Sequence, residues 1–582
     1  MKIKVANTAG FCKGVKRAMN IVLDTANRKK KNIYTYGPLI HNPQAVELLE
    51  SKNVKIVNDI SEISSGTVII RTHGISPEIK KGIEESGANI YDATCPDVMK
   101  VQYLIKRYSE RGYFIVIVGD RGHPEVIAHL GFSNGKGIVV DSLEELDQIP
   151  EREKICVVVQ TTYNHDRFQE IANIIQKRFP QSEIYNTICD ATFKRQKEVR
   201  EICEEVDCMV IVGGRNSGNT IRLVKIAEST GTPTIHVETE EEIDEEKLSR
   251  FNFIGISAGA STPNWLIQKV IDRIEGIKER KKEKTPLLTH GLKLLVRANI
   301  YVALGAGFLT YATSLLQGIN PVSETFFISS LYVFSMHVLN RFTDRTAGRF
   351  NDPARIKFYE RHSRVLIISG IVSIAISLFI ASKLGFIPFI ILLASCLLGI
   401  FYSIKLIPKG WKKIKYKRLK DIPASKDIFI ALAWSTVTVI LPFMADKKGV
   451  FLPMIISFLF AFFVVLIRAI IFDLRDIQGD RIVGRETLPI IIGENKAENI
   501  ILGLGAIVGF TLIISIFFHW VSSLGWLFCI SIIYIFFYLY LYKKRMFAQR
   551  LSWETIIDGN FVLLGLVAFL WNSLYQSPFS LY

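Results

Sequence analysis

Three cysteines, Cys12, Cys95 and Cys189, share one local pattern. Each follows a short stretch typical of a strand or loop and precedes a basic run with a helical pattern, which predicts a thiol at a helix N-terminus. The helix dipole and the unpaired N–H groups there stabilise a thiolate, which is a good ligand for a soft metal. Three thiolates on a four-iron cluster leave one iron open for a substrate. The competing interpretation is three buried structural cysteines, because cysteine often packs as a small hydrophobe.

The spacing of these cysteines bears on the kind of site. Cys95 lies 83 residues after Cys12, and Cys189 lies 94 residues after Cys95. Such gaps are too long for a local zinc knuckle but suit three similar α/β units around an axis. The chain has eight cysteines, which in a cytosolic protein argue for metal or redox chemistry rather than for disulfides. Three of the others are expected in the core: Cys156, Cys203 and Cys208.

The elements that position these residues follow from the apolar pattern of the first half. Short apolar runs alternate with amphipathic segments, which indicates parallel sheets with crossover helices. The clearest strand patterns are 67–70, 113–118, 155–159 and 208–212. Binding sites in such sheets lie at the carboxyl ends of the strands. Polar residues in the loops that follow these strands are therefore candidates for the site.

Those loops are rich in groups that bind phosphate. His41, His73 and His123 each stand just after a predicted strand. Segments 160–162, 213–220 and 258–263 add hydroxyls, an amide and glycines. Histidines, hydroxyls and open N–H groups suit a diphosphate. The sequence has no Walker-type lysine and no dinucleotide fingerprint, which argues against ATP and NAD. Any one of these histidines taken alone reads more simply as a loop residue with satisfied hydrogen bonds.

Residues 1–280 resemble the LytB-type family of 4-hydroxy-3-methylbut-2-enyl diphosphate reductases, with the motifs in the same order. The resemblance implies a three-lobed, pseudo-threefold α/β fold around a [4Fe-4S] cluster held by Cys12, Cys95 and Cys189. It also implies a site for the substrate diphosphate, made by His41, His73, His123, Thr161, Ser217, Gly218, Asn219 and Ser261. The family usually has Ser-Ser-Asn where this chain has Ser217-Gly218-Asn219, so we expect weaker substrate binding rather than lost activity.

The same resemblance implies a reaction, which is reductive dehydroxylation to isopentenyl and dimethylallyl diphosphate in the non-mevalonate pathway. Glu125 is expected to supply a proton to the departing hydroxyl, with Thr161 close to both groups. Two electrons pass through the cluster from a donor such as ferredoxin or flavodoxin. An alternative is an iron-sulfur electron-transfer or sensing module. The histidines and Glu125 argue against it, because electron transfer needs no diphosphate pocket.

The second half has a different composition. After Leu292 the chain carries nine apolar segments, near 298–317, 325–340, 365–382, 386–404, 428–444, 450–472, 499–518, 523–541 and 556–575. Runs of this kind predict an all-α polytopic domain of about nine transmembrane helices. We expect a reductase domain over 1–280, a basic linker over 281–292 and a membrane domain over 293–582.

Charge predicts the orientation of this domain. The net charge is +16, and much of it lies in loops between apolar segments, which favours membrane anchoring over nucleic-acid binding. No secretory signal precedes the first strand pattern. The loops on the side of the first half hold most of the Lys and Arg residues. The positive-inside rule then places a multi-pass protein in the cell inner membrane, with its catalytic first half in the cytoplasm.

Two loops on that inner side concentrate acids where helices end. One runs from Asn340 to Asp352, and the other holds Asp473, Asp476 and Asp480. Carboxylates spaced by three or four residues lie on one helical face. Acids at the end of a membrane helix are costly unless they bind cations or line a polar cavity, and Mg²⁺ prefers oxygen ligands that it bridges to phosphates. Either motif alone reads more simply as a solvated loop.

Together with segment 479–489, these motifs resemble the UbiA-type intramembrane prenyltransferases over 293–582. The resemblance implies Mg²⁺ held against a prenyl diphosphate by Asn340, Asp344, Asp473, Asp476 and Asp480, and transfer of the prenyl group to an acceptor that the sequence does not identify. The family usually has a further aspartate where this chain has Gly348, and Asn351 or Asp352 is expected to replace it. A membrane anchor without catalysis is the alternative. The basic loop 412–420 could help to bind phosphates, but anchoring to the membrane surface is the simpler interpretation.

Overall fold

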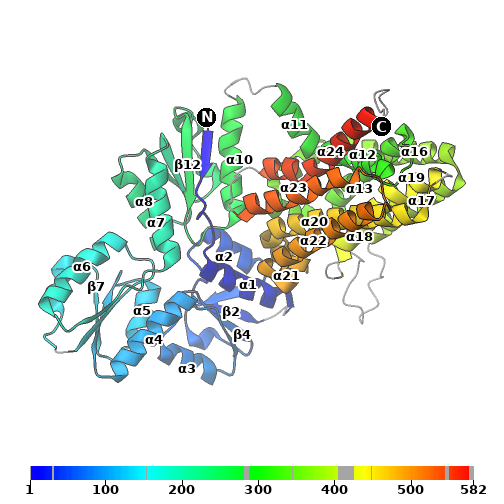
Figure 1. Ribbon diagram of the computed structural model, residues 1–582. Helices are drawn as coiled ribbons and strands as arrows, with labels where there is room; N and C mark the ends of the chain where they lie inside the picture. Colours follow the sequence, from blue (N-terminus) through cyan, green and yellow to red (C-terminus); the bar gives the residue numbers. More distant parts are fainter. Residues whose placement is uncertain are drawn as a thin grey trace. The chain divides into compact units, whose positions relative to one another are not determined.

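The structure is a computed structural model that describes residues 2–28, 32–152, 154–280, 287–343, 345–403, 422, 425–446, 449–543 and 550–575 (Figure 1). The chain forms two compact units, Met1–Glu283 and Lys284–Tyr582. Asp344, the basic loop 412–420 and residues 281–286 of the expected linker lie outside the described residues. The rest of that expected linker, 287–292, begins helix α11 (Leu287–Arg297).

The first unit contains three parallel sheets of four strands each. The first sheet has the order β3 (Val54–Val57), β2 (Ile33–Tyr36), β4 (Thr67–Ile70), β5 (Asn89–Asp92). The second has the order β7 (Gly137–Val140), β6 (Phe114–Val118), β8 (Ile155–Val159), β9 (Glu183–Tyr185). The third has the order β11 (Thr234–Val237), β10 (Cys208–Val212), β12 (Phe253–Ala258), β1 (Lys2–Val5). The predicted three-lobed α/β fold is confirmed.

All three sheets repeat one strand order. Counted along the chain, with β1 as the last strand of its lobe, each sheet runs second, first, third, fourth, so that the first and third strands lie in the centre. The central strands are the most buried, and every residue of β8 and β10 is inaccessible to solvent, as expected for apolar strands covered on both faces. The expected strand patterns coincide with β4, β8 and β10, and β6 starts one residue late. The chain closes the third lobe with its first strand, since β1 pairs in parallel with β12.

Helices connect the strands and flank the sheets (Figure 1). Four of them, α2 to α5, have proline at their first position, where no intrahelical N–H is needed, so each helix begins at a defined residue. The helices of this unit are α1 (Lys13–Arg28), α2 (Pro43–Glu50), α3 (Pro77–Glu85), α4 (Pro96–Glu110), α5 (Pro124–Gly131), α6 (His165–Arg178), α7 (Asp190–Cys203), α8 (Gly218–Ser229), α9 (Glu245–Leu248) and α10 (Asn264–Arg280).

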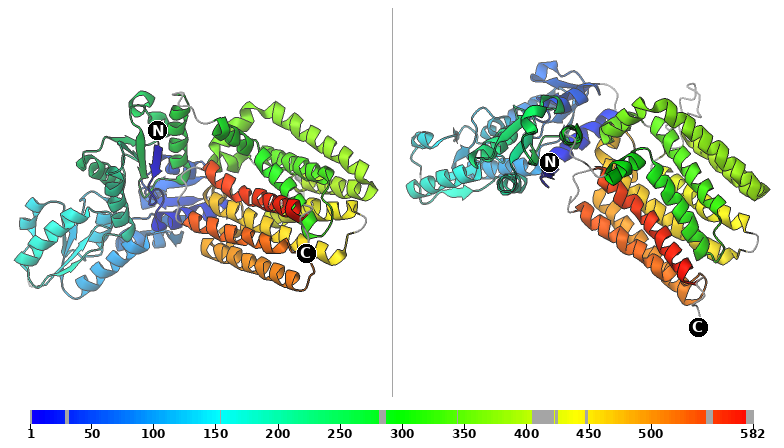
Figure 2. Two further views of the ribbon diagram at one scale, coloured as in Figure 1. Left: turned by 45° about the horizontal axis from the view of Figure 1, so that its top comes forward. Right: turned by 90° about the horizontal axis from the view of Figure 1, so that it is seen from above.

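The described part of the second unit is entirely helical, and its long helices run side by side (Figure 2). They are α12 (Ile300–Leu316), α13 (Ser323–Thr343), α16 (Ser363–Leu384), α17 (Phe386–Ser403), α18 (Ser425–Ser435), α20 (Phe451–Val483), α22 (Glu494–Phe517), α23 (Gly525–Lys543) and α24 (Arg550–Tyr575). A π-helical turn, Thr436–Ile440, joins α18 to α19 (Leu441–Ala445) just before Pro442, which has no N–H to donate. Short helices α14 (Arg345–Asn351), α15 (Pro353–Arg361) and α21 (Leu488–Ile492) complete it.

Each of the nine apolar segments contains a helix, but the count of nine membrane spans is not confirmed. Within the described residues, six helices are long and apolar enough to cross a membrane. A seventh is counted if Gly291–Arg297 and Ile300–Leu316, which meet at 81°, form one broken span. The break lies at Asn299, whose backbone is left-handed (φ 62°). Large apolar side chains face outward, including Val365, Ile368 and Ile371 of α16, as expected for a surface that contacts lipid.

Candidate functional site

Cys12, Cys95 and Cys189 occupy the same place in the three lobes. Each follows the fourth strand of its sheet and directly precedes a helix: α1, α4 or α7. The backbone N–H of each donates to a carbonyl two residues beyond the end of the third strand. These bonds join Cys12 to Ala260 (3.2 Å), Cys95 to Thr72 (2.9 Å) and Cys189 to Thr161 (3.0 Å). The predicted helix N-termini are confirmed, and one local device is used three times.

The three thiols lie near one another. A Cβ on Gly14, in the first turn of α1, would stand 2.5 Å from Cys95 Sγ, so this helix start packs directly against Cys95. Cys12 also interacts electrostatically with both Cys95 and Cys189. Three sulfur donors from helix N-termini, with a glycine leaving space beside one of them, fit a shared iron-sulfur cluster.

The protonation of Cys95 and Cys189 differs from the sequence-based expectation. Burial raises the pKa of the Cys95 thiol to about 11, although N–H groups of Asp97 and Val98 act against this rise. Burial also raises the pKa of Cys189. Removal from water therefore outweighs the helix terminus when no cation is present. A bound metal supplies the positive charge that ionises such thiols.

Side chains of neighbouring lobes hold the cysteine loops. Arg17 of α1 donates to the carbonyls of Asp92 (3.2 Å) and Thr94 (3.1 Å), which precede Cys95. Glu198 of α7 accepts from the Thr8 hydroxyl (2.6 Å), and buried Arg195 donates to the Gly10 carbonyl (2.7 Å). The helix that follows one cysteine thus fixes the loop that carries another.

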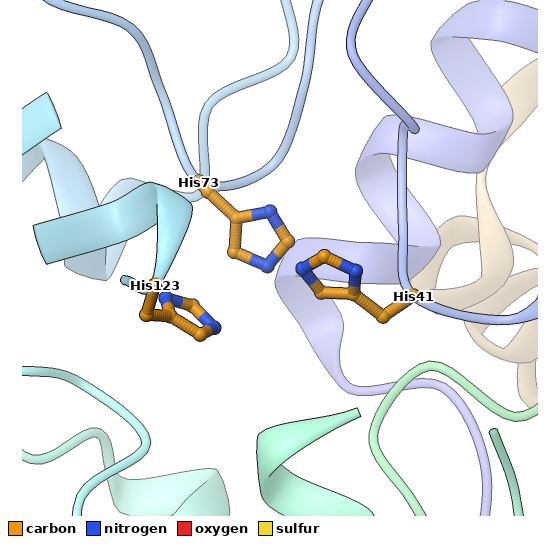
Figure 3. A group of neighbouring side chains, drawn as sticks. All are labelled: His41, His73 and His123. Atoms are coloured by element: carbon orange, nitrogen blue, oxygen red, sulfur yellow. The ribbon is translucent and has the colours of Figure 1, made fainter. Parts of the chain in front are cut away.

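His41, His73 and His123 gather beside these loops from three separate segments (Figure 3). The ring centroid of His73 lies 4.7 Å from that of His41 and 5.2 Å from that of His123. One ring nitrogen from each of the three histidines lies within 4.8 Å of the other two. Burial lowers the pKa of His41 to about 4 and also lowers the pKa values of His73 and His123. The free site therefore holds neutral imidazoles.

Some ring nitrogens of these histidines have no hydrogen-bond partner among the described residues. His41 Nε2 and His73 Nδ1 are buried with no hydrogen-bond partner among the described residues. His123 caps α5, and its Nδ1 accepts from the N–H of Glu125 (3.2 Å). An accepting Nδ1 in a neutral ring leaves the proton on Nε2, which is then free to donate. Three neutral imidazoles whose nitrogens lie this close together could also bind a zinc ion. The hydroxyl groups and the helix N-terminus around them favour an oxyanion instead.

The third lobe completes this pocket. Ser217 caps α8, and its hydroxyl accepts from the N–H of Thr220 (3.4 Å). Ser261 Oγ donates to the His41 carbonyl (3.1 Å), and the buried Asn219 amide has no partner among the described residues. A Cβ on Gly218 would have ordinary contacts only, the nearest at 3.7 Å, so a serine fits at this position.

Glu125 and Thr161 meet as predicted, and the structure adds His129. The Thr161 N–H and hydroxyl donate to the two Glu125 carboxylate oxygens at 2.7 and 2.9 Å. His129 Nε2 lies 3.4 Å from Glu125 Oε1, and both side chains are almost completely buried. Burial acts to raise the pKa of Glu125, but His129, with His123 and the Thr161 N–H, outweighs it and holds that pKa below its usual value. The spacing of four residues on a helix was the signal for His129, and sequence reasoning missed it.

The two acidic motifs of the second unit also meet. α14 packs against α20, and Asn351 Nδ2 donates to Asp480 Oδ1 (3.1 Å). Asp352 caps α15 by accepting from the N–H of Arg355 (3.0 Å) and also interacts electrostatically with Arg475 of the second motif. A Cβ on Gly348 would stand 2.6 Å from Ile356 Cδ1, so this position packs against apolar atoms.

The remaining predicted acids have distinct surroundings. Asp473 and Asp480 are buried on α20, whereas Asp476 pairs with Arg475 (2.9 Å). Asn340 lies in the last turn of α13, where its carbonyl accepts from the Thr343 hydroxyl (3.0 Å).

Sequence reasoning missed Lys426 and Asp427, at the start of α18. Lys426 Nζ lies 2.7 Å from Asp473 Oδ1. Their signal was a charged pair directly before an apolar run.

Comparisons with known proteins divide the chain in the same two halves. Residues 3–275 match the family model described as LytB protein, and residues 299–572 match the model of the UbiA prenyltransferase family. A 4-hydroxy-3-methylbut-2-enyl diphosphate reductase of Aquifex aeolicus (strain VF5) is 43% identical over 281 residues, covering 48% of this chain and 97% of the relative. A reductase of the same description from Clostridioides difficile (strain 630) is 40% identical over 280 residues, covering 48% of this chain and 100% of the relative. The solved structure of a UbiA homolog from Archaeoglobus fulgidus bound to GPP and Mg²⁺ is 20% identical, covers 48% of this chain and 99% of that one, and has a TM-score of 0.36.

Proposed function

Because the chain belongs to the LytB family over residues 3–275 and carries a UbiA prenyltransferase domain over residues 299–572, we propose that it joins two isoprenoid activities in one polypeptide. The first unit reduces 4-hydroxy-3-methylbut-2-enyl diphosphate to isopentenyl and dimethylallyl diphosphate. The second transfers a prenyl group from a prenyl diphosphate to an acceptor. The proposed domain bounds are 1–280 and 293–582, joined by 281–292.

The first unit is proposed to hold a [4Fe-4S] cluster through Cys12, Cys95 and Cys189. When bound, that group supplies two electrons from ferredoxin or flavodoxin and a site of Lewis acidity for the substrate hydroxyl. The equivalent backbone bonds of the three cysteines are the observation that carries this proposal. Their repetition supports one shared ligand better than three unrelated core cysteines.

The polar pocket is proposed to bind the substrate diphosphate. His41, His73 and His123 present buried donors, and Ser217, Asn219 and Ser261 add polar groups from the third lobe. The N–H groups at the start of α8, including that of Gly218, also face an anion favourably. Neutral imidazoles that lack partners gain hydrogen bonds when phosphate oxygens enter.

Glu125 and Thr161 are proposed to deliver a proton. Removal of the hydroxyl as water and protonation of the remaining carbon consume two protons and two electrons. The Thr161 hydroxyl bonds to Glu125 Oε2 (2.9 Å), which makes a short path from the carboxyl group to a hydroxyl beside Thr161. Entry of the negative diphosphate raises the carboxyl pKa and so favours the protonated acid.

A reductase assay tests this half. The chain is purified anaerobically, its iron-sulfur centre is reconstituted, and oxidation of a reduced viologen dye is followed with 4-hydroxy-3-methylbut-2-enyl diphosphate. We expect turnover in the wild type and none in Cys95→Ser. Glu125→Gln is expected to keep the centre and lose most turnover. An intact centre that neither binds nor reduces the substrate would instead support an electron-transfer or sensing module.

The second unit is proposed to bind Mg²⁺ against a prenyl diphosphate through Asn340, Asp344, Asp473, Asp476 and Asp480. The contact between Asn351 and Asp480 supports this assignment, because it joins the segments that carry the two motifs. Loss of diphosphate would leave an allylic cation among apolar helices, where an acceptor captures it. Mg²⁺-dependent prenyl transfer by membranes containing the chain, absent in Asp476→Asn, would support this role.

One observation favours a second candidate for this unit, a membrane anchor without catalysis. Gly348 packs against Ile356, where the family usually has an acid. Absence of transfer by the wild type with a range of prenyl diphosphates would support the anchor. In either case we propose a multi-pass protein of the inner membrane with nine crossing helices and a cytoplasmic reductase unit.

A further inference from the structure

Asp427, at the start of α18, is buried against another carboxylate. Its side chain is 2% exposed and lies within hydrogen-bonding reach of the Asp473 carboxylate, and no N–H or hydroxyl group among the described residues donates to either of its oxygens. A lone carboxylate in that position costs free energy unless a cation or a hydrogen-bond donor faces it. Two adjoining carboxylates are stabilised by a shared proton or by a cation between them, and a bound cation would take oxygens from both.

The neighbours of Asp427 are mostly acids of the second motif. Asp427 interacts electrostatically with Asp473 and Asp480, both 1% exposed. Oδ2 of Asp473 also lacks a partner among the described residues. Asp427 on α18 and Oδ2 of Asp473 on α20 thus lie in one acidic cluster and receive no N–H or hydroxyl donor from the described residues.

The cations described near this cluster do not balance it. Lys426 Nζ contacts Asp473 Oδ1 (2.7 Å), and Arg485 Nη1 lies 3.6 Å from Asp480 Oδ1. Three carboxyl groups face these two cations, so the cluster carries one unbalanced negative charge when all three are ionised. The Lys426 side chain is 35% exposed, which leaves it able to turn away from Asp473. The Lys426 ammonium group contacts an oxygen of Asp473, and a metal ion bound by Asp473 would contact the same carboxylate.

We propose that Asp427 is a further ligand of the divalent-cation site formed with Asp473 and Asp480, and that Lys426 holds this site as an internal cation until the metal displaces it. Mg²⁺ or Mn²⁺ would take oxygen ligands from both helices. The displaced Lys426 ammonium would then bind a phosphate oxygen of the prenyl diphosphate. This inference rests on the proposed prenyltransferase site and adds two residues to it.

Equilibrium dialysis of Mn²⁺ with the full chain in detergent micelles tests the role of Asp427. Asp473→Asn defines the binding that belongs to this site. We expect Asp427→Asn to weaken Mn²⁺ binding by about tenfold or more, as loss of a ligand does, and Asp427→Glu to restore part of it. Asp446→Asn, at the other end of the same helical segment, is the matched control and should bind as the wild type. Thermal unfolding of each variant shows whether it is folded.

Lys426→Met tests the internal cation. Removal of a competing positive charge should strengthen binding of Mn²⁺ alone, and it should abolish the extra affinity that inorganic diphosphate gives the wild type. Weaker or unchanged Mn²⁺ binding in Lys426→Met would overturn the role of Lys426.

The two proposals fail in different ways. Wild-type Mn²⁺ affinity in folded Asp427→Asn, together with lost binding in Asp473→Asn, would overturn the role of Asp427 and leave the prenyltransferase site in place. No Mn²⁺ binding by the wild type would overturn both.

Discussion

Gly14 lies directly against the sulfur of Cys95. A Cβ at residue 14 would stand 2.5 Å from Cys95 Sγ, closer than real side chains approach, and 3.2 Å from Cys95 Cβ. The first turn of α1 therefore requires glycine, so that the helix following Cys12 can pass beside the second cysteine. This contact places the start of the helix that follows Cys12 beside Cys95, which the spacing of the two cysteines in the sequence does not show.

Gly14→Ala is expected to displace the Cys95 sulfur and weaken the iron-sulfur centre. Iron and sulfide content after anaerobic reconstitution, with the visible absorption of the centre, measures the effect. Gly122→Ala is the control, because a Cβ there meets open space. Equal iron content in both variants would show that the thiol beside Gly14 does not hold the centre.

His129→Gln is expected to raise the pKa of Glu125, because the contact with His129 is the strongest influence that lowers it. Glu125 donates its proton only below its pKa, so the alkaline limb of the pH profile for kcat should move to higher pH. The profile is measured by viologen oxidation from pH 5 to pH 9. An unmoved alkaline limb would show that His129 does not act through Glu125.

The cluster-free chain is expected to lose stability as pH falls from about 6.5 toward about 4. The pKa of His41 is lowered from 6.5 to about 4, so the unfolded chain binds a proton in this window that the folded chain excludes. Stability due to the neutral ring is thus complete above pH 6.5 and declines below it. His41→Gln should flatten this decline in thermal unfolding, whereas His165→Gln, at a partly exposed ring, should not.

Gly218→Ser is expected to strengthen substrate binding. The added Cβ has ordinary contacts, and the hydroxyl supplies one more donor to the proposed diphosphate pocket. One added hydrogen bond contributes about 0.5–1.5 kcal/mol, so the KM should fall by about two- to tenfold. A higher KM in the viologen assay would show that the pocket is adapted to glycine.

Gly479→Ala is expected to separate the two acidic motifs. A Cβ at residue 479 would stand 1.9 Å from Asn351 Oδ1, so Asn351 must leave its contact with Asp480. Metal-dependent prenyl transfer should fall by about tenfold or more, as for loss of a group that orients metal ligands. Gly503→Ala, which meets open space on α22, is the control. Equal transfer by both variants would place the metal elsewhere.

Local sequence was sufficient for much of the first unit. Apolar period and length mark β4, β8 and β10 because a strand covered on both faces must be apolar throughout. Helix starts after Cys95 and His123 follow from the proline at the next position. The residue types, thiols and imidazoles in loops at strand ends, then indicate the chemistry.

Other features depend on segments far apart in the chain. The pairing of β1 with β12, the meeting of three histidines from two lobes, and the contact between Asn351 and Asp480 all join distant residues. An apolar pattern reports which face of an element is buried but not which other element covers it.

The sequence by itself determined the two halves of this protein, the strand and helix pattern of the first, the apolar helices of the second, and the residue types that carry the chemistry. Only the tertiary structure decided which of those residues meet. It placed His129 against Glu125 and Lys426 against Asp473, and it raised the pKa of Cys95 where the helix terminus predicted a fall. The physical reason is that burial and charge pairing arise from the packing of distant segments, whereas periodicity, capping and proline act within a few residues.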